Sequence, residues 1–244
     1  MNNSIRTTEN KVRRNSEEVD RDIMLATKEL VEEIGFNKLT LAKIGDKAHL
    51  APNMFYKRYP DLEKLIEKFI RKYDYWFNDI VEISFDKSSL GEYYETVMLN
   101  LAESLYENKA MQQILIYELS NDNSITRRTA RLRELDSNEN LREYDPLFEN
   151  TDVDIRTHTA LIIAGIYYLI LHRDRSEFCG IDLNTDEGRR RLHKTISYTC
   201  NMLFDKVENK YNVSHVAKNM KNENIDISVI SKCTGLSKKE IEAL

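Results

Sequence analysis

Residues 22–65 read DIMLATKELVEEIGFNKLTLAKIGDKAHLAPNMFYKRYPDLEKL, and this stretch decides the fold. Its apolar residues recur every three or four positions before Gly35, which predicts a core-facing helix with a glycine just past its end. Thr40 and Asp61 belong to the residue types that cap helix N-termini, and Pro52 suits the first turn of a helix between them. The stretch therefore predicts a series of short helices joined by tight turns.

The helix that begins at Pro52 continues with the letters NMFYKRY, residues 53–59. A helix that enters the DNA major groove reads base edges with its exposed N-terminal side chains. Asn53 can pair with an adenine edge, and Met54 can pack against a thymine methyl group. A hydroxyl and two cations follow at Tyr56, Lys57 and Arg58. The candidate DNA contacts in this helix are Asn53, Met54, Tyr56, Lys57 and Arg58.

This stretch resembles the DNA-binding domain of the TetR family of transcriptional regulators. The similarity is dense and ordered, although it covers less than a fifth of the chain. The matching residues are Ala26, Leu30, Gly35, Phe36, Leu39 to Ile44, Ala48, Phe55, Tyr56, Tyr59, Pro60, Glu63 and Leu65. The resemblance implies an all-α protein. Its N-terminal domain would be a three-helix helix-turn-helix that binds DNA, and its larger helical domain would bind a ligand and dimerise.

The resemblance implies that Tyr59 packs in the core. It also implies which residues touch the DNA backbone. Carried over to this chain, the phosphate contacts are Thr40, Lys43, Tyr56, Lys57 and Lys64. Three positions depart from the usual pattern. His49 stands where the family has a turn glycine, Ala51 replaces a hydroxyl cap, and Leu62 replaces a frequent lysine. The turn is therefore expected to hold His49 at a positive φ.

Composition and charge agree with an N-terminal DNA-binding domain and a larger helical domain. The chain contains only 7 Gly and 3 Pro in 244 residues, which favours helices throughout. Lys and Arg outnumber Asp and Glu by 15 to 12 in residues 1–72, whereas acidic residues exceed basic ones by 29 to 21 in the remainder. An electropositive end on an acidic body suits phosphate contact at that end alone.

The chain is expected to have four parts. Residues 1–15 form a disordered basic arm, and residues 16–62 form the helix-turn-helix domain with Ser16 as its first N-cap. Residues 63–212 form the helical regulatory and dimerisation domain, in which 136–151 is expected to be a loop. Residues 213–244 form a small helical extension, beginning with a separate short helix at HVAKNM.

Two long helices, at about 152–172 and 186–207, are expected to form the homodimer interface that the family uses. The first contains ALIIAGIYYLIL, whose twelve apolar residues are too few to span a bilayer, so we expect a buried helix and no membrane partner. Burial within one copy is the alternative to dimerisation. A dimer would read a palindromic double-stranded operator. The candidate residues for a small-molecule effector pocket are Trp76, Tyr94, Met98, Tyr117, His158 and Ile162.

The C-terminal phrase AKNMKNENIDISVISKCTGLSKKEIEAL resembles the helical tail of transposase-like proteins of the PD-(D/E)xK nuclease group. It also has the form of a small helix-turn-helix, in which Ser237 and Glu240 make a capping box. The nuclease core of that group needs strand-borne carboxylates, and no strand pattern is present. The tail is therefore interpreted as a packing or interaction module.

The sequence contains no motif for a catalytic site, a cofactor or a metal. The three cysteines are far apart and form no CxxC pair, which suits a reducing cytoplasm. We therefore expect a cytoplasmic, non-enzymatic transcriptional regulator, a repressor released from its operator by a small molecule. The alternatives are a DNA-binding regulator whose body docks a protein partner and, less favoured, a nuclease.

Overall fold

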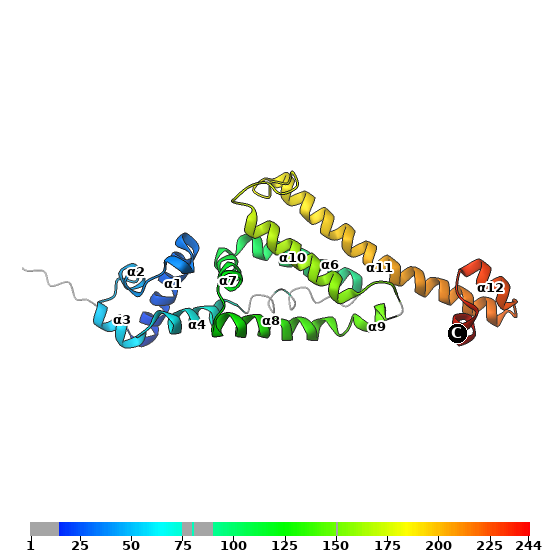
Figure 1. Ribbon diagram of the computed structural model, residues 1–244, viewed down its shortest axis with the longest axis horizontal. Helices are drawn as coiled ribbons and strands as arrows, with labels where there is room; N and C mark the ends of the chain where they lie inside the picture. Colours follow the sequence, from blue (N-terminus) through cyan, green and yellow to red (C-terminus); the bar gives the residue numbers. More distant parts are fainter. Residues whose placement is uncertain (1–14, 75–79, 81–89, 150) are drawn as a thin grey trace, which may run out of the picture. The chain divides into compact units, whose positions relative to one another are not determined.

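The computed structural model describes residues 15–74, 80, 90–149 and 151–244, without the side chains of 206 and 208–212. The described residues are largely helical, and their only β pairing is an isolated bridge between Phe178 and Ile181 (Figure 1). The expected all-α fold is confirmed. The chain divides into two compact units, Met1–Tyr75 with Lys109–Thr126, and Trp76–Asn108 with Arg127–Leu244.

The first unit contains the expected series of short helices. Its elements are α1 (Ser16–Ile34), the 3-10 turn η1 (Phe36–Lys38), α2 (Leu41–Lys47), α3 (Pro52–Arg58), α4 (Leu62–Tyr73) and α7 (Lys109–Ser120). Thr40 and Asp61 cap α2 and α4 as expected. The cap of α1 is Asn15, one residue before the expected Ser16. Asn15 is favoured because its amide oxygen accepts from the backbone N–H of Glu18, whose carboxylate accepts in return.

Aromatic rings join α7 to η1 and η1 to α4. The Phe36 ring lies 4.8 Å from the Tyr117 ring and 5.8 Å from the Phe69 ring, measured between centroids. Helices α4 and α7 thus belong to the same compact unit as α1 to α3. This division differs from the boundary expected at residues 62 and 63, because a contact between segments so far apart in sequence leaves no local signal.

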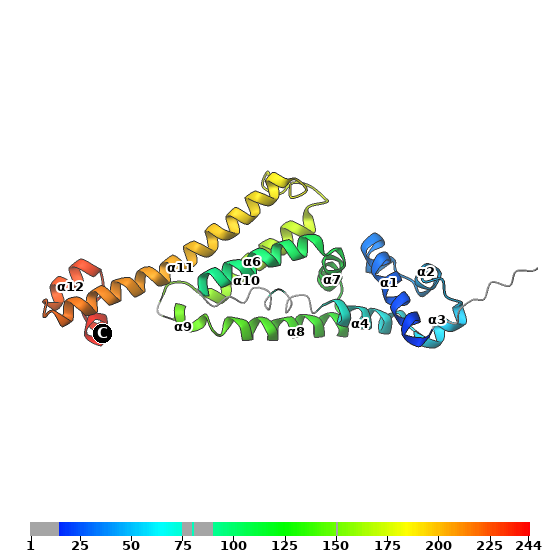
Figure 2. The same ribbon diagram turned by 180° about the vertical axis from the view of Figure 1, so that it is seen from behind.

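In the second unit, three long helices pack together: α6 (Leu90–Glu107), α10 (Ile155–His172) and α11 (Asp186–Asn222). Helix α6 contacts both α10 and α11, as the opposed views in Figures 1 and 2 show. Its apolar stripe, which includes Leu101 and Leu105, is fully buried. The other helices among the described residues are α8 (Ser124–Leu141), which is as long as α6 and α10, and the short helices α9 (Asp145–Phe148), α12 (Ile227–Thr234) and α13 (Lys238–Ala243).

Two expected boundaries are wrong in this unit. The segment expected to be a loop at 136–151 is helical as far as Leu141 and again in α9. Polar side chains support the added turns, since the Asn138 amide donates to the Glu134 carboxylate at 2.6 Å, one helical turn away. Arg156 of α10 also holds this segment, because its Nε and Nη2 donate to the two carboxylate oxygens of Asp145 at 2.9 and 2.7 Å.

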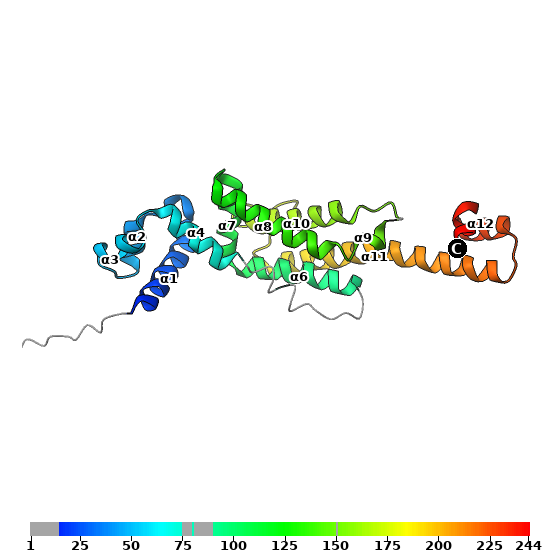
Figure 3. The ribbon, with the colours of Figure 1, turned by 90° about the horizontal axis from the view of Figure 1, so that it is seen from below.

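Helix α11 runs to Asn222, far beyond the expected end near residue 207. The phrase HVAKNM is its last part and not a separate helix, because no Gly or Pro follows Gly188 within α11 to break it. Helices α12 and α13 fold back onto this end and form a small core from Ala217, Ile230 and Ile241 (Figure 3). The expected capping box between Ser237 and Glu240 is present.

Candidate nucleic-acid interface

The turn between α2 and α3 is closed by backbone hydrogen bonds around His49. The Leu50 N–H donates to the Gly45 carbonyl at 3.0 Å, and the His49 N–H donates to the Asp46 carbonyl at 3.1 Å. This is the Schellman pattern, which requires a left-handed residue after the helix. His49 supplies it with a φ of 53°, as the sequence predicts. The turn therefore has a fixed geometry that sets where α3 begins.

Helix α3 has one buried side and one exposed side. Phe55 is buried at 1% exposure and anchors the helix, and Tyr59 is buried just beyond its end. The expected packing role of Tyr59 is confirmed. Met54 and Tyr56 are each 47% exposed although both are largely apolar. The exposed side chains of α3 that the sequence nominates for DNA contact are Asn53, Met54, Tyr56 and Lys57.

The three phosphate candidates outside α3 are all exposed. The Thr40 hydroxyl accepts from the Lys43 N–H at 3.2 Å, so it is also the N-cap of α2. The Lys43 ammonium donates to the Lys38 carbonyl at 3.0 Å. Lys64, in the first turn of α4, lies 3.6 Å from the Asp61 carboxylate that caps the same helix. All three side chains are accessible, and the two ammonium groups are held only by exposed partners.

Arg58 is placed differently from the other candidates. Its side chain is 25% exposed and its guanidinium faces α1, where Nε lies 2.9 Å from the Asp20 carboxylate. Its Nη2 donates to the Ser16 carbonyl at 2.8 Å and also to the Ser16 hydroxyl. The periodicity of α3 places Arg58 near the exposed face, but it cannot reveal a partner 42 residues earlier in the chain.

Most of the ligand-pocket candidates lie in the second unit. Tyr94 and Met98 are buried on α6, and the Tyr94 hydroxyl is 2.8 Å from the Thr159 hydroxyl of α10. His158 and Ile162 are half-buried on α10. Tyr117 is not grouped with them, because it belongs to the first unit and packs on Phe36. Trp76 lies outside the described residues.

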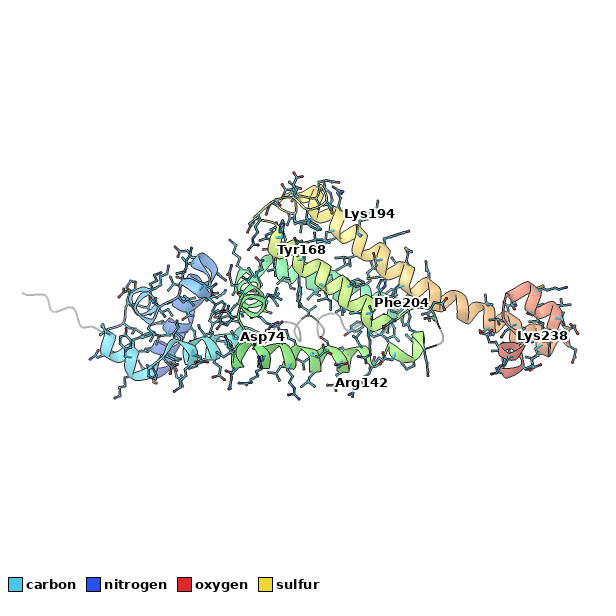
Figure 4. The ribbon with its side chains drawn as sticks, viewed as in Figure 1. Asp74, Arg142, Tyr168, Lys194, Phe204 and Lys238 are labelled. Atoms are coloured by element: carbon cyan, nitrogen blue, oxygen red, sulfur yellow. The ribbon has the colours of Figure 1, made fainter. Side chains whose placement is uncertain are left out.

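Aromatic rings surround Tyr94 in this unit. The Phe204 ring, labelled in Figure 4, lies 5.5 Å from the Tyr94 ring and 5.4 Å from that of Phe148. Tyr144 joins the cluster at 5.5 Å from Tyr94. Burial raises the pKa of the Tyr94 phenol well above its usual value, and it raises the pKa of the Cys200 thiol to about 12. Both groups are therefore neutral at physiological pH.

Helices α10 and α11 leave large apolar side chains uncovered. On α10, Leu161 is 68% exposed and Tyr168 is 50% exposed; on α11, Tyr198 is 64% exposed and Met202 is 50% exposed. Tyr168 is labelled in Figure 4. The expectation that the apolar segment of α10 is too short to span a bilayer is wrong by length and composition, because α10 extends over 18 residues and is apolar enough to cross a membrane. Within the described chain, 22% of this helix is buried. The expected burial of this helix is therefore not achieved within one copy of the chain.

Comparison with known proteins gives a match of fold. No family model and no curated protein matches the sequence. Among solved structures, the chain is similar to a protein from Vibrio parahaemolyticus that is assigned as a TetR-family transcriptional regulator. The TM-score is 0.51 at 17% sequence identity, and the match covers 73% of this chain and 96% of that protein. The chain thus has the all-α fold of this TetR-family protein.

Proposed function

We propose that this protein is a sequence-specific DNA-binding transcriptional regulator that reads a palindromic operator through α3. One observation carries the proposal: α3 turns Phe55 inward and leaves Asn53, Met54, Tyr56 and Lys57 in solvent. An exposed face with an amide, a thioether, a phenol and an ammonium group matches the chemistry of base edges and phosphates. A helix that served only to pack would have no need of this combination.

The first test removes two of the proposed DNA contacts from the exposed face of α3. Tyr56→Ala combined with Lys57→Ala is expected to abolish binding to a duplex that the wild-type protein has selected from a random pool. Both side chains are exposed, and the Tyr56 ring lies 6.0 Å from the buried Phe55 ring, so their removal is expected to leave the fold intact. Gel-shift titration measures the affinity, and circular dichroism and sedimentation check the fold and the mass.

The matched control is Lys218→Ala, which removes an exposed cation from α11 in the second unit. It is expected to leave DNA affinity unchanged. Unchanged affinity in the Tyr56 and Lys57 double variant would reject α3 as the DNA-reading element.

We further propose that the protein acts as a homodimer through α10 and α11. The apolar residues that these helices leave exposed would be covered by the same helices of a second copy. Ala164 and Gly165 lie on the exposed side of α10, and a Cβ atom added at Gly165 would meet no described atom within 4 Å beyond its own chain neighbours and helix backbone. Small residues there allow close approach of a second helix. A two-fold dimer would also present two copies of α3, as a palindrome requires.

Regulation by a small molecule is proposed for the second unit. The neutral hydroxyl pair of Tyr94 and Thr159 within an aromatic cluster has the mixture of apolar lining and few polar groups that ligand sites use. An effector there would release the operator only if it bound the DNA-incompetent state more tightly. We therefore propose a cytoplasmic repressor relieved by a largely apolar effector.

A further inference from the structure

Asp20 lies where α1, α3 and α4 meet, and its carboxylate faces two cations. Oδ1 is 2.9 Å from Nε of Arg58, the last residue of α3, and Oδ2 is 3.3 Å from Nζ of Lys68 on α4. The Asp20 side chain is 36% exposed and the Arg58 side chain 25%, so this pair is more sheltered than the exposed pair of Lys64 and Asp61. One carboxylate thus connects three helices of the first unit.

Arg58 makes its contacts with α1 on two sides of the guanidinium. Nε lies 2.9 Å from Oδ1 of Asp20, an ion pair without hydrogen-bond geometry, while Nη2 donates to the backbone carbonyl of Ser16 at 2.8 Å. A planar guanidinium can donate to one group while its charge faces another, whereas a lysine ammonium has a single charged centre. The hydrogen bonds of Nη2 therefore give the contact its direction, and the charge of Asp20 adds attraction.

Helix α3 needs such a support because it has only seven residues. A helix of that length is not stable in isolation, so its direction is set by what holds it. The turn at His49 holds its N-terminal end, Phe55 holds its middle, and Arg58 holds its C-terminal end. Loss of the last support would let the exposed face around Tyr56 and Lys57 tilt away from the DNA.

We infer that Asp20 is a positioning residue for DNA reading, which acts by holding Arg58 and thereby α3 against α1. This inference rests on the proposed function. It also gives Arg58 a different role from the expected DNA contact: its guanidinium holds α3 on the side that faces α1 and does not contact DNA. Binding functions of this kind require side chains held within roughly 0.5 Å and 10–20° of the productive geometry.

The inference predicts an effect opposite to that of simple electrostatics. Removing a negative charge from a DNA-binding unit ordinarily strengthens binding, because repulsion from the phosphates falls. Asp20→Asn is instead expected to weaken binding to the selected duplex about tenfold, since Arg58 loses the charge of its ion-pair partner. Glu17→Gln removes the same charge from an exposed position in the first turn of α1, and it is expected to leave affinity unchanged or slightly raised.

Fluorescence anisotropy on the full-length protein gives the required affinities over a range of salt concentrations, for the selected duplex and for an unrelated one. Asp20→Asn and Arg58→Lys are expected to lower affinity for the selected duplex more than for the unrelated one. Both are expected to keep the wild-type salt dependence, because no phosphate contact is removed. Unfolding would lower the affinities for the selected and the unrelated duplex together. The ratio of these two affinities therefore distinguishes a positioning defect from loss of the fold. Arg58→Lys keeps the charge and provides the second variant if Asp20→Asn folds poorly.

Two results would overturn the positioning role while leaving the proposed function intact. One is an Asp20→Asn protein that binds the selected duplex as tightly as wild type or more tightly. The other is an Arg58→Ala protein whose slope of log affinity against log salt falls by about 1.8 per dimer, the value for two lost phosphate contacts. Failure of the wild-type protein to bind any duplex would overturn the proposed function and this role with it.

Discussion

His49 holds the turn before the reading helix at a φ of 53°, in the left-handed region that glycine adopts most easily. The sequence predicts this conformation because the position is a turn glycine in the family that residues 22–65 resemble. The same resemblance predicts the buried Tyr59, and local chemistry predicts the caps at Thr40 and Asp61. The sequence does not predict the partners of Arg58, because they lie on another helix.

The first stability prediction concerns this turn. His49→Gly relieves the left-handed strain but adds freedom to the unfolded chain, so the free energy of unfolding should rise by at most about 1 kcal/mol. His49→Val should lower it by roughly 1–2 kcal/mol, because a β-branched residue fits a positive φ poorly. Urea denaturation followed by circular dichroism measures both.

A matched control for this turn is Asp46→Gly, which places glycine in the last turn of the ordinary helix α2. It is expected to lower the free energy of unfolding by roughly 0.5–1 kcal/mol. If His49→Gly were as destabilising as this control, the turn would not have the geometry described.

At the scale of helices, local pattern predicts where most elements begin but not where the longest ones end. Start signals are side-chain caps, such as Thr185, which accepts from the Gly188 N–H and begins α11 at the expected place. The end of α11 lacks a glycine or proline, and residues 207–222 form a polar stretch that continues the helix. The same holds for α8, whose last turns depend on contacts of Asn138 with Arg156.

The loop before α11 provides a prediction at this scale. A Cβ atom at Gly188 would lie 1.9 Å from the Asp182 carbonyl oxygen, which also accepts from the Thr185 hydroxyl at 2.7 Å. Gly188→Ala must therefore push the loop off the first turn of α11, at a cost of about 1–3 kcal/mol. Thermal unfolding should show a lower Tm, whereas Glu187→Ala at the adjacent exposed position should have little effect. An unchanged Tm in Gly188→Ala would contradict this packing.

At the scale of the whole molecule, the two units differ in what they leave exposed. The first presents the polar and cationic face of α3, within a segment where basic residues outnumber acidic ones. The second presents the apolar residues of α10 and α11. The sequence predicts both helices but not their exposure. An apolar helix has the same sequence pattern whether it is buried within its own chain or against another copy. The proposed dimer accounts for both surfaces. It covers the apolar residues of α10 and α11, and it presents the exposed face of α3 twice.

Selection of duplexes from a random pool tests this account most directly, with the wild-type protein compared with a variant that carries Leu161→Glu and Tyr198→Glu. Charges on the exposed faces of α10 and α11 should prevent pairing and leave a monomer by sedimentation, because both side chains point into solvent in the single chain. The wild type is expected to enrich an inverted repeat whose half-sites are about 34–36 Å apart or a multiple of that distance. The monomer is expected to enrich no repeat. Two results would contradict the account. One is that the wild type enriches no sequence. The other is that the wild type and the variant enrich the same single half-site without an inverted repeat.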